Sequence, residues 1–446
     1  MLAAVVVLVV AGVVGYALSR PKRPRRSARR FSRLPVLAAV VVLVVAGVIG
    51  YALPRPKAWE RIGAPITVHA WAPYWQTDSA LASFNSNTDV FSDLSLFAYH
   101  ATAAGAVESY DGLDPNVPPI YRQAANAAGV RFTASIVDDT GKGAMASILA
   151  NPVTRAVHVE TILRLAVGTG GNGGDGVDGG GFDGIDIDYE TFAFGDDRDT
   201  WQATRPNWVL FVEELSEALH EVDKTLTVSV PPMYDPERTG GDRGYWVYDY
   251  EAIGKVVDYV RVMAYDYSTA EAGPIAPIAW VKGLVSDIKK MVPAEKLILG
   301  IPAYGYNWPT STLGVCPVGQ EPKRQNQSTK SAAALAAGLG IIPTFDPDRA
   351  ESTFTYNERL TGTDPSGADA ECTVTRTVWY ADARAVYERA WLAERQDLAG
   401  IAIWSLGSDD ELVWPGIDAA RADMDEWPPR AGDGTTDQAA TVFTAG

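Results

Sequence analysis

The sequence predicts an α/β protein built on a closed (β/α)8 TIM barrel, and two observations lead to this fold class. From about residue 65 onward, short runs rich in β-branched and aromatic residues alternate with longer amphipathic stretches, and eight such runs occur. The chain of 446 residues is long enough for one such barrel, which needs about 250 residues. An open doubly wound sheet is the structural alternative, but neither a GxGxxG motif nor a P-loop follows an early strand.

The first 61 residues differ from the rest and predict a membrane anchor. They contain two apolar segments, 2–18 and 36–53, which belong to near-identical copies because residues 2–22 recur at 37–57 with only two differences. Each copy has about 17–18 uninterrupted apolar residues, at the short end of a transmembrane helix. We interpret the second copy as an uncleaved anchor; the first is either a second span or a duplication.

The basic linker between the copies, residues 19–35, sets the predicted orientation. It carries eight Lys or Arg residues and no acid, so it should stay in the cytoplasm, with the chain after residue 53 outside. The predicted location is therefore the cell membrane, with the main part of the chain on the extracytoplasmic side. Interpreted as a signal peptide, the second copy would instead give a secreted protein, although "GYALPRPK" offers no convincing cleavage site.

The predicted barrel spans residues 62–427, with helical stretches between most of its strands. One of them, in "NWVLFVEELSEALHEV", places Trp208, Phe211 and Leu215 at the spacing of an amphipathic helix. The predicted strands are residues 66–74, 94–99, 130–137, 184–189, 226–231, 258–265, 296–304 and 400–406.

Three stretches depart from a plain barrel. Residues 168–181, "GTGGNGGDGVDGGG", form a Gly/Asp loop; its nonapeptide 170–178 fits the pattern of calcium-binding β-rolls, but a single copy cannot stack, so a flexible insertion is the favoured interpretation. A small polar insertion at 309–378 separates the seventh strand from the last helix. Residues 428–446 are expected to form a loose tail.

Charge and cysteine content limit the possible partners. Beyond residue 61 the chain has 27 basic and 54 acidic residues, a net charge of −27, which disfavours nucleic acid and anionic polymers and fits a neutral substrate. Neither the four histidines nor the two cysteines have metal-ligand spacing, and no nucleotide, haem or flavin motif occurs, so no metal or cofactor is expected. In an exported domain Cys316 and Cys372 are a candidate disulfide; two unpaired buried thiols are the alternative.

The stretch "GGGFDGIDIDYETF", residues 179–192, carries the candidate chemistry. Alternation in a strand sends Asp186, Asp188 and Glu190 to one face, where unpaired buried carboxylates would be costly. Active sites of barrels lie at the C-terminal ends of the strands, so Glu190 should lie at the mouth with the two aspartates progressively deeper. Neighbouring acids that share a proton raise the pKa of the outer one, which makes Glu190 a candidate general acid. A divalent-metal site and purely structural acids at a helix end are the alternatives.

The same residues carry a family resemblance. "DGIDIDYE" (183–190) matches the DxxDxDxE signature of glycoside hydrolase family 18, the chitinases and related N-acetylglucosaminidases. "VRVMAYDYS", "LILGIPAYGYNW" and "GIAIWSLGSDD" resemble the sixth, seventh and eighth strands of that family, in the same order, over about residues 65–420. "EAGPIAPIAWV" and "TVWYADARAV" look most like a bacterial branch that includes spore-cortex and cell-wall enzymes.

The resemblance implies hydrolysis of β-1,4-linked N-acetylglucosamine polymers by a retaining mechanism in which the substrate's own acetamido oxygen is the nucleophile. Glu190 would protonate the glycosidic oxygen, Asp188 would hold the acetamido N–H, and Asp186 would share a proton or a hydrogen bond with Asp188. Tyr265 with Asp266 would position the acetamido carbonyl.

Further residues receive substrate-binding or structural roles. Trp404 would form the apolar floor under the sugar, and Met263 lies in the sixth-strand element. For Tyr304 and Trp71, and for Trp75, sugar stacking and core packing are both open. Asp183 should order the entrance of its strand.

One departure affects the substrate. Where many chitinases carry SxGG, this chain has "SIVDD" (135–139), which weakens an assignment to crystalline chitin and leaves chitin fragments and peptidoglycan glycan both open. A catalytically silent sugar-binding protein on the same fold and a structural envelope protein are the other candidate functions. The presence of Glu190 argues against the silent protein.

Overall fold

The computed structural model of the protein describes residues 65–168, 181–237, 240–422 and residue 427. The predicted anchor (1–61), nearly all of the Gly/Asp loop, including its calcium-like nonapeptide, and the predicted tail (428–446) lie outside these residues. Within the described ranges, no helix has the length and apolar character that crossing a bilayer requires.

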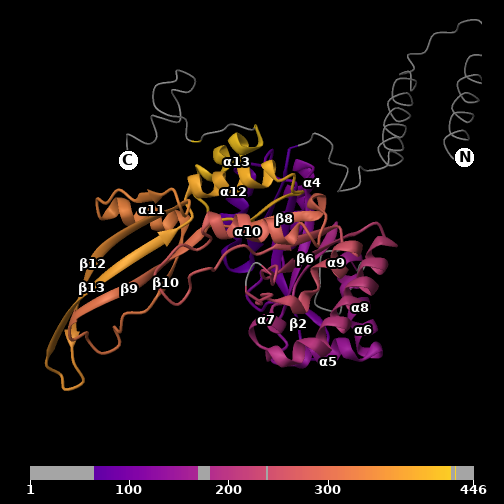
Figure 1. Ribbon diagram of the computed structural model, residues 1–446, viewed down its shortest axis with the longest axis horizontal. Coiled ribbons are helices and arrows are strands. Elements are labelled where there is room, and N and C mark those ends of the chain that lie inside the picture. The colour runs from indigo at the N-terminus through magenta and orange to yellow at the C-terminus, as the bar shows by residue number, and fades with distance from the viewer. Residues whose placement is uncertain (1–64, 169–180, 238–239, 423–426, 428–446) are drawn as a thin grey trace, which may run out of the picture. The chain divides into compact units, whose positions relative to one another are not determined.

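Eight parallel strands close a barrel in chain order (Figure 1). Each strand pairs with the next, and β1 pairs with both β14 and β2, which closes the ring; β3 (Val107–Ser109) joins β2 in antiparallel fashion. All eight predicted strands are confirmed, although β7 ends at Val262 instead of residue 265. The barrel strands are β1 (Thr67–Pro73), β2 (Asp93–Ala101), β4 (Arg131–Asp138), β5 (Gly184–Asp188), β6 (Thr225–Val230), β7 (Tyr259–Val262), β8 (Leu297–Pro302) and β14 (Gly400–Trp404).

Helices surround the barrel, and the outward-facing apolar residues of the strands pack beneath them in one core. The predicted amphipathic helix is α8, in which Trp208, Phe211 and Leu215 are buried as the spacing indicated. The helices are α3 (Thr77–Ser86), α4 (Val117–Ala128), α5 (Ala144–Ala150), α6 (Pro152–Val167), α7 (Thr191–Phe194), α8 (Trp201–His220), α9 (Tyr250–Val256), α10 (Ile278–Ile288), α12 (Ala383–Arg395) and α13 (Val413–Arg421), with 3-10 turns at Tyr74–Gln76, Arg198–Thr200, Trp246–Tyr248 and Ala294–Lys296.

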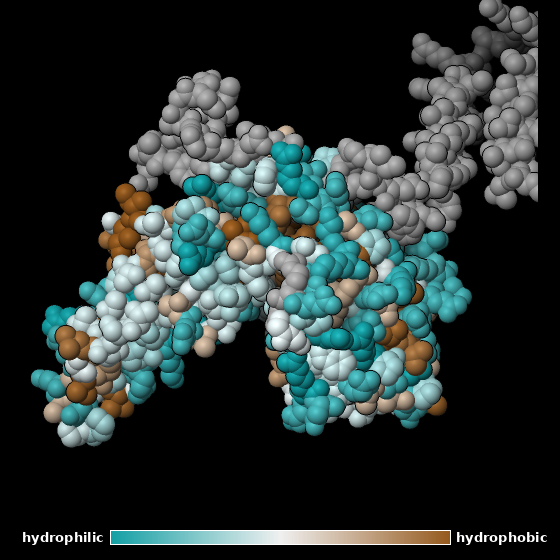
Figure 2. Space-filling view, in the orientation of Figure 1, coloured by the Kyte–Doolittle hydropathy of each residue, from teal (hydrophilic) through white to brown (hydrophobic). Residues whose placement is uncertain are grey.

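The predicted insertion is a separate antiparallel sheet that extends from residue 304 to residue 380, beyond the expected bounds at both ends. Its long strands project from the barrel in Figure 1, and the surface in Figure 2 is indented between the two parts. The predicted disulfide is confirmed, because the sulfur atoms of Cys316 and Cys372 are bonded. The sheet order is β10 (Gln325–Ser328), β9 (Tyr304–Gly314), β13 (Asp369–Tyr380), β12 (Glu351–Thr363), β11 (Thr344–Asp346), and α11 (Thr329–Gly338) packs on one face.

A buried ion pair joins this sheet to the barrel. Glu351 at the start of β12 accepts hydrogen bonds from the backbone N–H groups of Ile275 (2.7 Å) and Ala276 (2.6 Å) and from Arg389 of α12 (3.0 Å). Arg389 also donates to the carbonyl oxygens of Ala350 and Ala276, and both charged side chains are fully buried. The contacts therefore fix the insertion, the loop after β7 and α12 to one another.

We predict that Glu351→Gln lowers the free energy of unfolding by about 3–5 kcal/mol, because Arg389 would lose its buried counter-ion. Urea unfolding at neutral pH measures this change. Glu371→Gln is the matched control, since Glu371 pairs with Arg359 on the exposed surface of the same sheet and its loss should have no measurable effect. Equal stabilities of the two variants would contradict the proposed importance of the buried pair.

Candidate active site

The three acids of β5 lie as the alternation predicted. Asp186 and Asp188 face the barrel interior, while Ile185 and Ile187 are buried on the outer side of the strand. Glu190 comes two residues after the strand ends, immediately before α7. The strand therefore delivers two carboxyl groups to the interior and a third to the mouth.

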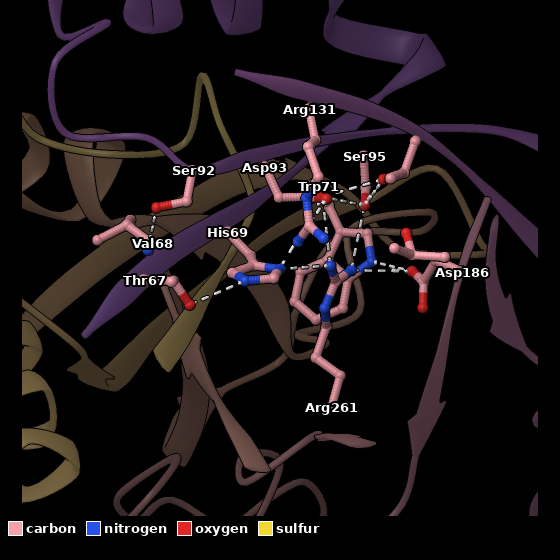
Figure 3. Close-up of polar contacts among 12 residues, drawn as sticks. Thr67, Val68, His69, Trp71, Ser92, Asp93, Ser95, Arg131, Asp186 and Arg261 are labelled. Atoms are coloured by element: carbon pink, nitrogen blue, oxygen red, sulfur yellow. Dashed lines mark hydrogen bonds and ion pairs between the residues drawn. The ribbon is translucent and has the colours of Figure 1, made fainter. Parts of the chain in front are cut away.

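Asp186 is the deepest of the three and is surrounded by hydrogen-bond donors (Figure 3). Its Oδ2 accepts from Trp71 Nε1 (2.9 Å), Ser135 Oγ (2.7 Å) and Arg261 Nη1 (3.0 Å), and its Oδ1 accepts from Ser229 Oγ (2.7 Å). These partners come from β1, β4, β7 and β6, so they span the barrel interior. Asp186 is therefore held in place by four donors, one of them a guanidinium.

Asp188 has the opposite environment. It is 3% exposed, and its Oδ1 has no hydrogen-bond partner among the described residues. Burial raises the pKa of Asp188 well above its usual value, and the charges of Glu190 and Asp186 add to this, while Arg261 opposes it. The expected hydrogen bond between Asp186 and Asp188 is not present among the described contacts, in which all four partners of Asp186 are other side chains.

Glu190 has the titration of a general acid that works near neutral pH. Burial, and then the negative charge of Asp266, raise its pKa to about 7. Because Asp188 also favours its protonated form, the two side chains bind protons as a coupled pair rather than independently.

The residue between the two acids, Tyr189, anchors the end of β5 from the outside. Its hydroxyl lies 2.6 Å from His158 Nε2, and His158 Nδ1 lies 2.8 Å from the carbonyl oxygen of Gly105. Since a carbonyl can only accept, Nδ1 carries the proton and Tyr189 donates to Nε2. Burial lowers the pKa of His158, which keeps this neutral arrangement.

Asp266 follows β7 and is held by two tyrosines from the insertion. Its Oδ1 accepts hydrogen bonds from Tyr306 (2.6 Å) and Tyr304, and its backbone has a positive φ of 58°. Tyr304, for which sugar stacking and packing were both open, therefore has a polar partner beside the acids. Tyr265 is a neutral phenol, because burial raises its pKa well above the usual value, and Met263 is 8% exposed.

The predicted aromatic residues divide into a buried and an accessible group. Trp71 is 1% exposed and belongs to the core, with its indole on Asp186, whereas Trp75 is 56% exposed. Trp404 is half-buried at the end of β14 and contacts Trp71 (5.7 Å between ring centroids), Trp75 (6.2 Å) and Phe97 (4.8 Å). The peptide bond after Trp404 is cis.

Asp183 has the contact expected of a residue that orders the strand entrance, since its Oδ2 accepts a hydrogen bond from Phe132 N (3.1 Å) at the start of β4. In "SIVDD", Ser135 binds Asp186, Asp138 turns toward Thr140, and Asp139 is 65% exposed, 3.9 Å from His100.

Several site residues were missed by sequence reasoning. Arg261 and Ser229 contact Asp186, and Tyr306 and Phe97 contact Asp266 and Trp404. The signal was present for two of them: Arg261 shares an inner-face alternation with Met263, and Tyr306 is two residues from Tyr304. Among the described residues, no group of three or more His, Cys, Asp or Glu side chains could hold a metal ion.

Comparisons with known proteins agree with this geometry. The sequence profile described as "Glycosyl hydrolases family 18" matches residues 70–409. The uncharacterised glycosylase YvbX of Bacillus subtilis is 28% identical over 236 residues, which is 52% of this chain and 60% of YvbX. The matched regions span about 40–66% of the first curated relatives.

Two solved structures share the fold. A chitinase from Chromobacterium violaceum superimposes with a TM-score of 0.63 at 24% identity, covering 80% of this chain and 99% of the chitinase. The spore cortex-lytic enzyme SleL of Bacillus megaterium gives a TM-score of 0.61 at 20% identity, covering 80% of this chain and 74% of SleL.

The raised pKa of Glu190 predicts a change in stability that is independent of activity. The folded state binds the proton of Glu190 more tightly than the unfolded state, whose glutamate has a pKa of about 4.3. The stability that this side chain contributes is therefore fully present below about pH 4.3. It is lost as the pH rises through about 7, because the folded state must then hold a poorly solvated charge. Glu190→Gln should therefore be more stable than the wild type at pH 8, by about 1–3 kcal/mol, and nearly equal to it at pH 4.

Urea unfolding at both pH values measures this difference. The control is Glu213→Gln, on the exposed face of α8. A Glu190→Gln variant with no gain in stability at pH 8 would show that the pKa of Glu190 is not raised to about 7 in the folded state.

Proposed function

The chain belongs to glycosyl hydrolase family 18, and we propose that it hydrolyses β-1,4 bonds of N-acetylglucosamine-containing polysaccharide by a retaining, substrate-assisted mechanism. The observation that carries the proposal is the pair formed by Asp188 and Glu190. One carboxyl group is buried with an oxygen that has no partner among the residues the structure describes, and the other has a pKa of about 7 at the barrel mouth. Such a pair suits a reaction in which Glu190 donates a proton and Asp188 accepts a hydrogen bond from the substrate.

Each residue has a role in the proposed reaction. Glu190 donates its proton to the glycosidic oxygen while the substrate's acetamido oxygen attacks the anomeric carbon, and an oxazolinium intermediate forms. The free oxygen of Asp188 accepts the acetamido N–H. Tyr265 donates to the acetamido carbonyl; Asp266 contributes to its placement and raises the pKa of Glu190. Water then opens the intermediate with Glu190 acting as base, and the configuration is retained.

Substrate binding relies on the aromatic side chains at the mouth. Trp404 forms the apolar surface under the reacting sugar, with Phe97 behind it (4.8 Å). Trp75, which is 56% exposed, extends that surface outward. Both chitin fragments and peptidoglycan glycan remain candidate substrates, since the solved structures with this fold include a chitinase and a cortex-lytic enzyme.

The proposed location is the extracytoplasmic face of the cell membrane. The two apolar segments at 2–18 and 36–53 and the basic linker between them support it. The disulfide between Cys316 and Cys372 is a second argument, because such bonds persist in oxidising compartments. Fractionation of cells that express the full-length chain tests this location.

The central test is Glu190→Gln, which should reduce hydrolysis of chitooligosaccharides by at least about 100-fold, because proton transfer by a positioned acid contributes about that much or more. Turnover by the wild type should fall as the pH rises through about 7, where Glu190 loses its proton. Glu213→Gln should behave as the wild type. Retained turnover in Glu190→Gln would overturn the mechanism, and sugar binding without turnover by the wild type would instead support the silent sugar-binding protein.

A thiazoline mimic of the oxazolinium is expected to inhibit, since it occupies the position of the proposed intermediate. Indifference to this compound, with activity otherwise intact, would point to an ordinary two-carboxylate mechanism.

Product analysis on chitin oligomers beside purified peptidoglycan strands would identify the substrate. The same chromatograms distinguish endo from exo action by the lengths of the first products.

A further inference from the structure

Glu190 lies beyond the hydrogen bonds that hold β5 in the barrel. The pairing of β5 with β4 ends at Asp188, and its pairing with β6 ends at Ile187. Among the described residues, none donates a hydrogen bond to the carboxyl group of Glu190. The position of this side chain therefore depends on its packing and on how the backbone on either side of it is held.

The backbone of Glu190 is held by hydrogen bonds on both sides. Its own carbonyl oxygen accepts from the N–H groups of Ala193 (2.9 Å) and Phe194 (3.1 Å), in α7. In the preceding peptide group, the carbonyl oxygen of Tyr189 accepts from the hydroxyl of Tyr248 (2.6 Å). Since the Tyr189 carbonyl and the Glu190 N–H belong to one planar unit, this bond helps to set the orientation of the peptide from which the acid projects.

Tyr248 is itself held in place by α8. It is fully buried at the end of the 3-10 turn Trp246–Tyr248, and its own carbonyl oxygen accepts a hydrogen bond from Trp208 Nε1 (3.0 Å). The rings of Tyr248 and Trp208 meet edge to face, with their centroids 5.7 Å apart. Arg205, also on α8, donates to the carbonyl oxygen of Trp246 (3.2 Å) in the same turn. Helix α8 thus fixes the turn from which the hydroxyl of Tyr248 reaches the end of β5.

We propose that Tyr248 is a positioning residue for Glu190: where the sheet hydrogen bonds of β5 end, its hydroxyl holds the peptide that precedes the acid. This inference rests on the proposed function and adds a residue that acts on Glu190 through the backbone. A buried carbonyl without a donor costs free energy, so loss of the hydroxyl should turn the Tyr189 peptide out of its present orientation. Glu190 would then be displaced from the position in which it meets the glycosidic oxygen.

Tyr248→Phe tests this role, because it removes the hydroxyl and keeps the ring that packs on Trp208. A displaced Glu190 should lower kcat for chitooligosaccharide hydrolysis by about 10–100-fold, since a misplacement of about 1 Å can cost that much. KM should change less than kcat, because the aromatic contacts of Trp404 at the mouth do not involve Tyr248. A wild-type kcat in Tyr248→Phe would overturn the proposal.

Tyr250→Phe is the matched control. Tyr250 is also fully buried, and its hydroxyl donates to the carbonyl oxygen of Pro231, which follows β6 and does not adjoin Glu190 in the chain. Each variant loses one buried hydrogen bond from a tyrosine hydroxyl to a carbonyl, so a mere loss of folded protein would reduce kcat in both. We expect a kcat close to that of the wild type in Tyr250→Phe. An equal fall in the two variants would overturn the proposal.

A second measurement does not depend on activity. In full-length protein labelled with 13C at glutamate carboxyl groups, the resonance that Glu190→Gln removes should titrate near pH 7 in the wild type, because burial and the charge of Asp266 raise the pKa. In Tyr248→Phe the midpoint should fall toward the usual glutamate pKa of about 4.3, since a displaced carboxyl group is better solvated. An unchanged midpoint would overturn the role of Tyr248. An inactive wild type whose midpoint still falls in Tyr248→Phe would instead refute the proposed hydrolysis alone.

Discussion

The ion pair between Asp186 and Arg261 is the interaction on which the rest of the site depends. Three carboxyl groups in a row along one strand repel one another, and the two deepest are shielded from water. With a guanidinium 3.0 Å from Asp186, the innermost charge is neutralised where it is most costly. Burial and the charges of Glu190 and Asp186 then raise the pKa of Asp188, while burial and the charge of Asp266 raise the pKa of Glu190. The barrel interior around Asp186 is lined by polar side chains because a buried carboxyl group needs hydrogen-bond donors.

The insertion contributes to the same electrostatics from the other side of the mouth. Tyr304 and Tyr306 at the start of β9 hold the carboxylate of Asp266, whose charge is the second cause of the raised pKa of Glu190. The insertion is itself fixed by the buried pair of Glu351 and Arg389. The insertion therefore contacts the residue whose charge helps to raise the pKa of Glu190.

The sequence was most informative where a regular pattern repeats. Eight strand-like runs with helices between them predicted the barrel, and the alternation of Asp186, Asp188 and Glu190 placed each acid correctly. The contacts of Arg261 were not predictable in this way, because His69, Ser95 and Asp186 are separated from it by 75 to 192 residues and meet only when the barrel closes. The same limit applied to the insertion, whose strands pair in the order β10-β9-β13-β12-β11.

Residues 135–139, "SIVDD" in place of SxGG, include one residue that contacts the row of acids and two aspartates that do not. Ser135 still donates to Asp186 (2.7 Å), so the acid row keeps its support. The two aspartates that follow behave differently: Asp138 is held by Thr140, whereas Asp139 is 65% exposed beside His100.

The exposed carboxylate of Asp139 lies near the acids of the site. Tyr110 stacks on His100. Burial raises the pKa of Tyr110 to about 12, and the charges of Asp139 and Asp188 both add to this. A negative charge there disfavours anionic glycans, in the same direction as the net charge of −27 beyond residue 61. Both charges support the proposal that the substrate is an uncharged stretch of N-acetylglucosamine polymer.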